Sequence, residues 1–339
     1  MTTCKAFISG CRGLALDAEE REFLRDADPW GLILFKRNIE SRAQILALTQ
    51  EFRTIVGRDD APVLIDQEGG RVQRMGPPHW RSYPAAQRFL AELPREEAHE
   101  AAGLTARLIA HDLFEVGITV NCAPVLDVAD ERTHAVIGSR AFAQTPEQVA
   151  YLGRAVLEGL IAGGVLPVVK HIPGHGRARA DSHLELPVVE ASLTELAARD
   201  FEPFRALNDA PAAMSAHIVY NALDPDAPAT TSARVVSEII RGQIGFQGLL
   251  FSDDLSMKAL KGSFSERARD VFAAGLDIAL HCNGDLDECR LVAEASPELS
   301  RRALARAKTA LSRIARGPEP FDAQAGAAKL AELRPALAA

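Results

Sequence analysis

Short runs of β-forming residues alternate with amphipathic helical segments along the whole chain of 339 residues. The runs lack strict apolar–polar alternation, which is typical of parallel strands whose two faces are both covered. They span residues 6–10, 31–35, 62–66, 117–125, 166–170, 212–217, 248–253 and 276–282. Eight strands alternating with helices predict an α/β fold, a closed (β/α)8 TIM barrel in a single domain, with a doubly wound open sheet as the alternative.

Helices are expected between these runs. Segments 41–56 and 145–164 carry apolar residues at helical spacing, and the second opens on Thr-Pro and ends on paired glycines. Other helices are expected to begin after the N-cap candidates Asp17, Ser192, Ser232 and Ser265. We assign residues 1–315 to the barrel and 316–339 to an Ala-rich tail or helix that packs on it or trails it.

Bulk properties narrow the function classes. The chain is 47% hydrophobic and 25% charged, as in soluble globular proteins, and its formal net charge of −8 argues against nucleic acid or an anionic membrane as partner. The sequence has no long apolar run that would span a bilayer, and its N-terminus does not resemble a signal peptide. Five cysteines without a CxxC pair predict reduced thiols in a cytoplasmic protein. We expect the protein to be a monomer that uses no cofactor and no metal.

Polar clusters follow five of the expected strands, at the carboxyl ends where barrel enzymes build their sites. The clusters are "DQEGGRVQR" after the third strand, "APVLDV" after the fourth, "KHIPGHG" after the fifth, "SAH" after the sixth and "SDDLSM" after the seventh. Their common position predicts one convergent site.

In "FSDDLSM", adjacent carboxylates end an apolar strand. Because side chains alternate along a strand, only one of Asp253 and Asp254 is expected to face the barrel axis. The alternative is that both cap the next helix or pair with surface cations.

Asp181 and His183 in "DSH" project to the same side of an extended loop. A carboxylate bonded to one imidazole nitrogen orients the ring, and a histidine is a competent proton donor and acceptor near neutral pH. The alternative is an Asx turn beside a surface histidine. His175, between two glycines, is assigned a structural role in orienting the loop.

Further candidates are ligand contacts. Lys170 and His171 end the fifth strand and can donate to hydroxyls or an anion, whereas Asp66 can accept hydrogen bonds from sugar hydroxyls. Arg74 contacts the same ligand or forms a salt bridge within its loop. Arg140 in "GSRAF" is, by sequence alone, an ordinary loop arginine.

An aspartate nucleophile together with a separate proton donor is what a retaining glycosidase requires. Here the Asp181–His183 pair would take the place of the usual second carboxyl. An aspartate near Lys170 and Arg74 would be ionised, as a nucleophile must be.

Three motifs, "DQEGGRVQR", "KHIPGHGRARADSH" and "FSDDLSM", together resemble the bacterial β-N-acetylhexosaminidases of glycoside hydrolase family 3. The resemblance runs from "GLILFKRN" to "AGLDIAL" and implies a barrel enzyme that removes non-reducing terminal N-acetylglucosamine. In similar proteins that sugar is β-1,4-linked to 1,6-anhydro-N-acetylmuramic acid in a muropeptide. Such a substrate would place the enzyme in peptidoglycan recycling, which bears on cell wall biogenesis, cell shape and cell division.

The resemblance implies a role for each motif residue. Asp253 would be the nucleophile, His183 the acid/base catalyst and Asp181 its partner. Contacts to the N-acetylglucosamine would come from Asp66, Arg74, Arg140, Lys170 and His171, of which Arg140 rests on the family alone. Only 57 residues follow Cys282, fewer than the second domain that supplies the acid in many family members, so "DSH" is expected to supply it. "IGSRAF" carries Ser where many relatives carry Glu.

Three other functions remain open at this level. A metal-dependent hydrolase would use His171, His175 and His183 with nearby aspartates, but the first strand lacks HxH and Lys170 would repel a cation. A non-catalytic sugar sensor would not need the dyad and the nucleophile together. A phosphorylase would use the same residues with phosphate in place of water.

Overall fold

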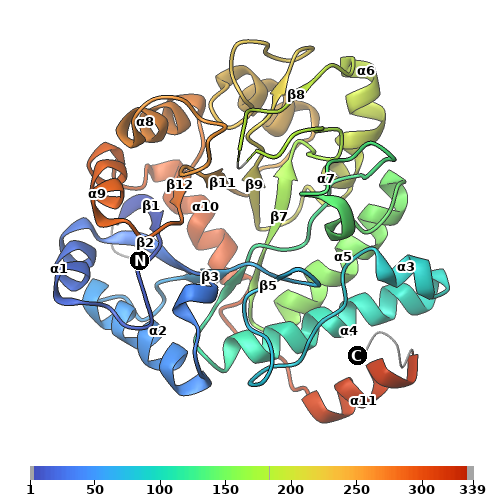
Figure 1. The fold of residues 1–339 in the computed structure, drawn as a ribbon, viewed down its shortest axis with the longest axis horizontal. Coiled ribbons are helices and arrows are strands. Elements are labelled where there is room, and N and C mark those ends of the chain that lie inside the picture. The colour runs from blue at the N-terminus through green and yellow to red at the C-terminus, as the bar shows by residue number, and fades with distance from the viewer. Residues whose placement is uncertain (1–3, 183, 334–339) are drawn as a thin grey trace.

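Eight parallel strands close into a barrel in the computed structural model, which describes residues 4–182 and 184–333. In chain order they are β1 (Lys5–Ser9), β2 (Pro29–Leu34), β3 (Val63–Ile65), β6 (Val120–Asn121), β7 (Leu166–Ile172), β9 (Ala212–Ser215), β11 (Leu249–Asp254) and β12 (Ile278–His281). Each pairs with the next along the chain and β12 pairs with β1. The predicted TIM barrel is confirmed, and the open sheet is excluded (Figure 1).

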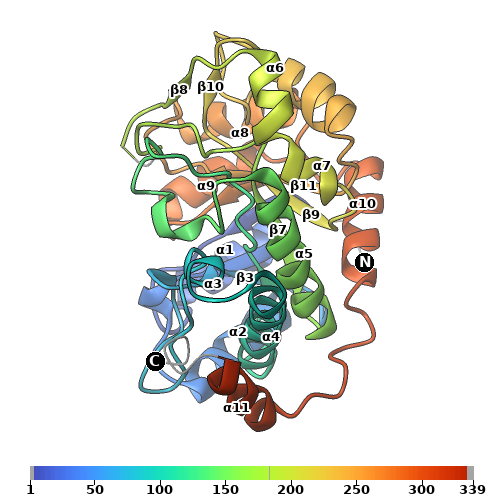
Figure 2. The same ribbon diagram turned by 90° about the vertical axis from the view of Figure 1, so that its right-hand side faces the viewer.

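Helices surround the strands in both ribbon views (Figures 1 and 2). The longer ones are α1 (Ala18–Ala27), α2 (Arg42–Val56), α4 (Arg95–Phe114), α5 (Pro146–Ala162), η4 (Val235–Gln243), α8 (Phe264–Ala274), α9 (Leu286–Ala295) and α10 (Arg301–Ser312). Short helices are η1 (Lys36–Asn38), α3 (Arg88–Glu92), η2 (Gly138–Arg140), α6 (Leu193–Glu195), η3 (Leu196–Asp200) and α7 (Glu202–Ala206). Two small sheets lie outside the barrel, β4 (Gln67–Gly69) with β5 (Val72–Gln73) and β8 (Val188–Val189) with β10 (Val219–Tyr220).

Side-chain caps begin the helices largely where the sequence predicts. Asp17 and Ser192 form capping boxes, and the Ser232 hydroxyl accepts a hydrogen bond from the backbone N–H of Val235. The prediction of Ser265 as a cap is wrong. Ser263 caps α8 with Glu266 as its reciprocal partner, because Glu three residues after the cap completes the box.

Side-chain alternation along the strands brings charge to one end of the barrel. Leu64 on β3, Leu166 and Val168 on β7, and Leu249 and Phe251 on β11 all belong to the inner core, whereas Ile65, Val169 and Leu250 pack in the outer layer against the helices. At the carboxyl end, the next inward position is Asp66 after β3, Lys170 on β7 and Asp253 on β11. The same period that fills the barrel with apolar residues therefore directs these three side chains toward its axis.

The C-terminal helix α11 (Ala323–Leu333) packs beside α4 in both views (Figures 1 and 2). Leu330 is buried there, and the Arg107 guanidinium lies 4.7 Å from the centre of the Phe321 ring. The predicted boundary between residues 315 and 316 stays a prediction. Within the part of the chain that the structure describes, no helix has both the length and the apolar character needed to cross a membrane.

Candidate functional site

A cavity of about 260 Å³ opens at the carboxyl ends of the barrel strands. Six of the predicted site residues line it: Asp66, Arg74, Arg140, Lys170, His171 and Asp253. Apolar groups, among them Phe35, Met214 and Met257, complete its wall. Residues that lie far apart in the sequence therefore meet in one cavity, which we call the pocket.

Buried ion pairs connect the charged groups of the pocket. The Lys170 Nζ lies 2.9 Å from an Asp66 oxygen and 2.6 Å from a Glu68 oxygen. Arg74 donates to Asp66 at 3.1 Å, and Arg140 donates to both oxygens of Glu68 at 2.8 Å. Glu68 was not among the predicted residues. Its place in "DQEGG", two residues beyond Asp66, is a signal that could have identified it, because both side chains then lie on the same side of an extended chain.

Opposite charges keep this network ionised despite its burial. Burial raises the pKa of Asp66, but Lys170 and Arg74 outweigh it and hold that pKa well below its usual range. Burial also raises the pKa of Glu68, but Arg140 and Lys170 outweigh burial and lower this pKa to about 2. Asp66 and Glu68 in turn raise the pKa of Lys170 against its desolvation. The pocket therefore presents fixed charges before any ligand enters it.

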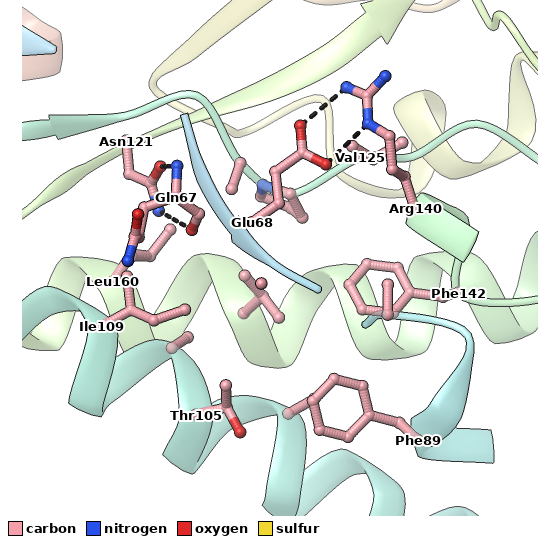
Figure 3. Close-up of a pocket in the computed structure, with 17 residues that line it drawn as sticks. Gln67, Glu68, Phe89, Thr105, Ile109, Asn121, Val125, Arg140, Phe142 and Leu160 are labelled. Atoms are coloured by element: carbon pink, nitrogen blue, oxygen red, sulfur yellow. Dashed lines mark hydrogen bonds and ion pairs between the residues drawn. The ribbon is translucent and has the colours of Figure 1, made fainter. Parts of the chain in front are cut away.

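A second, smaller cavity lies behind the Glu68–Arg140 pair (Figure 3). Its volume is about 30 Å³, and Phe89, Ile109, Phe142 and Leu160 contribute to its wall. Figure 3 shows both carboxylate oxygens of Glu68 engaged by the Arg140 guanidinium. This cavity has space for little more than a water molecule, so it does not compete with the pocket as a sugar site.

Asp127 holds His171 in place. Its Oδ2 lies 2.7 Å from His171 Nδ1, and its Oδ1 accepts the His171 backbone N–H at 3.2 Å. Asp127 is fully buried, which raises its pKa, but His171 is the main cause of a net fall to about 2. Asp127 lies in the "APVLDV" cluster that the sequence placed at the site. Its partner, 44 positions away, could not be read from local spacing.

The two aspartates that end β11 have different environments. Asp254 Oδ1 accepts the backbone N–H groups of Ser256 and Cys282, so Asp254 ties the strand end to its surroundings. Asp253 Oδ1 accepts the Asp254 backbone N–H at 2.8 Å, and the side chain lies in the pocket. Burial raises the pKa of Asp253, but His217, His171 and Lys170 bring it below its usual value. Asp253 is thus an ionised carboxylate facing the pocket.

His217, in the predicted "SAH" cluster, supports the end of β11 from β9. Its Nε2 lies 3.0 Å from the Asp254 carbonyl oxygen, which can only accept, so Nε2 carries the proton. Burial lowers the pKa of His217, and Nδ1 of its ring lies 2.8 Å from the Thr230 hydroxyl. The backbone carbonyl of the residue after the predicted nucleophile is therefore held by a buried histidine.

The dyad is described only in part. His183 lies outside the described residues, so its pairing with Asp181 stays a prediction. The Asp181 carbonyl accepts the backbone N–H groups of Leu184 and Glu185 at 2.9 and 3.0 Å. Burial lowers the pKa of Arg71, which lines the pocket, and the negative charge of Asp181 acts against that shift. The charge of Asp181 therefore acts on a residue of the pocket wall.

All five cysteines are buried and free of disulfides. In residues 4–182 and 184–333, no three or more His, Cys, Asp or Glu side chains are arranged to hold a metal ion.

Fixed charges around an ionised aspartate, in a cavity at the carboxyl ends of a closed barrel, define a barrel-enzyme site for a polar ligand. Residues 7–316 match the glycosyl hydrolase family 3 N-terminal domain. The chain belongs to glycoside hydrolase family 3, and the expected enzyme class, a glycoside hydrolase of the β-N-acetylhexosaminidase type, is confirmed.

Individual relatives resemble the chain over most of its length. A β-hexosaminidase from Pseudomonas aeruginosa is 42% identical over 308 residues, which cover 90% of this chain and 88% of that protein. The structure of NagZ from Neisseria gonorrhoeae, in complex with N-trifluoroacetyl-D-glucosamine, has a TM-score of 0.86 and 34% identity and covers 98% of each chain. A family 3 β-N-acetylglucosaminidase from Paenibacillus also has a TM-score of 0.86, with 28% identity over 97% of this chain and 67% of that one.

Proposed function

We propose that this chain is a retaining exo-β-N-acetylglucosaminidase that uses Asp253 as nucleophile and His183, oriented by Asp181, as acid/base catalyst. The observation that carries the proposal is the environment of Asp253, a half-buried carboxylate that lines the pocket with its pKa lowered, whereas the neighbouring Asp254 carboxylate is held by the backbone N–H groups of Ser256 and Cys282. A nucleophilic carboxylate must be ionised and must face the anomeric carbon of a bound sugar.

The reaction has two balanced steps. In the first, an Asp253 oxygen bonds to C1 of the sugar as the bond from C1 to the leaving oxygen breaks, and the His183 imidazolium gives its proton to that oxygen. In the second, the neutral imidazole takes a proton from water, the water oxygen bonds to C1, and the bond from C1 to Asp253 breaks. Two inversions at C1 return the β-anomer.

Recognition of the sugar falls to the pocket network. Asp66 accepts hydrogen bonds from sugar hydroxyls, and Lys170, His171, Arg74 and Arg140 donate to its oxygens. The preference for N-acetylglucosamine is supported by the similar Neisseria gonorrhoeae protein, whose structure holds N-trifluoroacetyl-D-glucosamine. The aglycone, 1,6-anhydro-N-acetylmuramic acid with its peptide, rests on the family resemblance. We place the enzyme in the cytoplasm as a monomer in peptidoglycan recycling, in keeping with its five free thiols.

The decisive experiment measures hydrolysis of an aryl β-N-acetylglucosaminide by the wild type, Asp253→Asn and His183→Ala, with the product anomer followed by NMR. The proposal is supported if the β-anomer is the first product that the wild type releases and if Asp253→Asn loses nearly all hydrolytic activity. First release of the α-anomer, or an Asp253→Asn variant that stays active, refutes it. Repeating the wild-type assay with added phosphate tests the phosphorylase alternative, which requires the rate to rise and a sugar phosphate to form.

A further inference from the structure

Ser182, which lies between the two predicted dyad residues, is buried in a segment that otherwise lies at the surface. Its exposed fraction is 3%, whereas Leu184 is 67% exposed and Arg179 and Glu185 are exposed as well. A buried hydroxyl needs a hydrogen-bond partner, and the Ser182 Oγ lies 3.3 Å from Nε2 of His175. Ser182 is therefore the point at which this loop enters the protein.

The backbone around His175 is held on both sides. Its own N–H donates to Asp127 Oδ1 at 2.7 Å, the Gly174 carbonyl accepts the Tyr220 hydroxyl at 2.8 Å, and the Gly176 carbonyl accepts the Thr133 hydroxyl at 2.7 Å. A Cβ on Gly176 would collide with the Val128 carbonyl, so the turn after His175 requires glycine. His175 thus provides a fixed attachment for the Ser182 hydroxyl.

Asp127 connects this attachment to the sugar pocket. One of its oxygens accepts the backbone N–H groups of both His171 and His175, and the other bonds to the His171 ring. A continuous set of hydrogen bonds therefore leads from the pocket wall at His171, through Asp127 and His175, to Ser182 in the loop. His171 lies on β7, whereas Asp127, His175 and Ser182 lie in the loops that follow β6 and β7.

We infer that His175 and Ser182 are positioning residues, which hold the loop of Asp181 and His183 at the pocket so that the acid/base proton reaches the leaving oxygen. The inference rests on the proposed function, since it assigns the acid/base role to this loop. It predicts that loss of the Ser182–His175 contact weakens proton donation while leaving sugar binding and the nucleophile intact.

The test compares substrates that differ in their need for a proton. A 2,4-dinitrophenyl β-N-acetylglucosaminide has a leaving group that departs unprotonated, whereas the phenyl glycoside needs an acid. For Ser182→Ala we expect kcat/KM to fall at least about tenfold on the phenyl glycoside and less than about threefold on the dinitrophenyl glycoside, because acid catalysis contributes only to the first. Leu184→Ala, in the same loop but exposed, is the matched control and should leave both values unchanged.

A second pair of variants separates positioning from folding. His175→Gln keeps a polar group near Nε2 and should restore the wild-type ratio of the two substrates in part, whereas His175→Leu should behave as Ser182→Ala does. Equal losses on both substrates, or no loss on either, overturn the inference. His183→Ala must show the same dependence on the leaving group. If it does not, the proposed function fails, whereas if it does and Ser182→Ala does not, only the inference fails.

Discussion

The floor of the pocket and the loop above it are built in different ways. The floor residues Asp66, Lys170 and Asp253 end barrel strands, and the network around Asp66 and Lys170 is held by several short ion pairs. Residues 179–186 are mostly exposed or half-buried and enter the protein at Ser182. The comparison indicates that sugar binding depends on a preassembled surface, whereas proton transfer depends on a segment with far fewer attachments.

The largest effect should come from the floor. Asp253→Asn replaces the nucleophile by a neutral amide of the same shape, and we expect kcat to fall roughly a thousandfold or more on every aryl glycoside, because no leaving group removes the need for a nucleophile. Steady-state kinetics on the phenyl and dinitrophenyl glycosides measures this. A loss confined to the phenyl substrate would assign Asp253 to the acid role instead and erase the distinction between floor and loop.

The buried network should be the next most sensitive feature. Glu68→Gln removes the carboxylate between Arg140 and Lys170, and we expect the free energy of unfolding to fall by about 3 kcal/mol because two buried cations lose a counter-charge. Urea unfolding measures the loss, and KM for the aryl glycoside should rise with it.

Glu238→Gln is the matched control, since Glu238 pairs with Arg234 at the surface and both side chains are about 60% exposed. That variant should change the free energy of unfolding by less than about 0.5 kcal/mol. Equal effects of the two substitutions would contradict the view that the floor is held by its charges.

The attachment of the loop should respond to pH. Burial, and next the neighbouring His171, lower the pKa of His175 from 6.5 to about 4. Between pH 6.5 and about pH 4 the unfolded chain binds a proton at His175 that the folded chain does not. The free energy of unfolding therefore has its full value above pH 6.5 and decreases as the pH falls toward 4. His175→Gln lacks this group, and between about pH 7 and about pH 4.5 the wild type should lose roughly 2 kcal/mol more than the variant. Parallel losses in urea unfolding would show that His175 is not buried as described.

Chelation should have the smallest effect. Arg74, Lys170 and Arg140 already pair with the Asp66 and Glu68 carboxylates, which leaves these carboxylates little free charge for a metal ion. We expect wild-type activity on the aryl glycoside to stay within experimental error after dialysis against EDTA. Loss of activity that added zinc restores would favour the metal-dependent hydrolase and would assign the floor a different chemistry.

Local periodicity and turn chemistry were enough to predict the barrel and the floor of its pocket. Asp66 and Lys170 were identified because each ends an apolar strand, at the end of the barrel where such enzymes build their sites. Alternation left Asp253 and Asp254 as alternatives, and the choice of Asp253 came from the family resemblance. The contacts that sequence reasoning missed join distant segments. Asp127 bonds to a ring 44 residues away, and the His217–Asp254 contact spans 37 residues. No local pattern encodes such pairs, because closure of the barrel creates them.

Ser182 was overlooked for a related reason. A serine in a polar loop has no sequence signal for burial, and only the placement of His175 beneath it reveals its role. The misplaced cap of α8 is different, since the Glu three residues after Ser263 was available to decide between Ser263 and Ser265.

The alternation along β11 also constrains how this sequence can change. Asp253 and Asp254 are chemically identical, and their separate tasks are set by whether each occupies an odd or an even place counted from the apolar base of the strand. Deletion of one codon between Leu249 and Ser252 would bring Asp254 to the place of Asp253, and insertion of one codon would bring Asp253 to the place of Asp254, in both cases without altering either aspartate. Natural variation in this segment should therefore consist of replacements and spare its length, whereas the loops outside the barrel are free to lengthen.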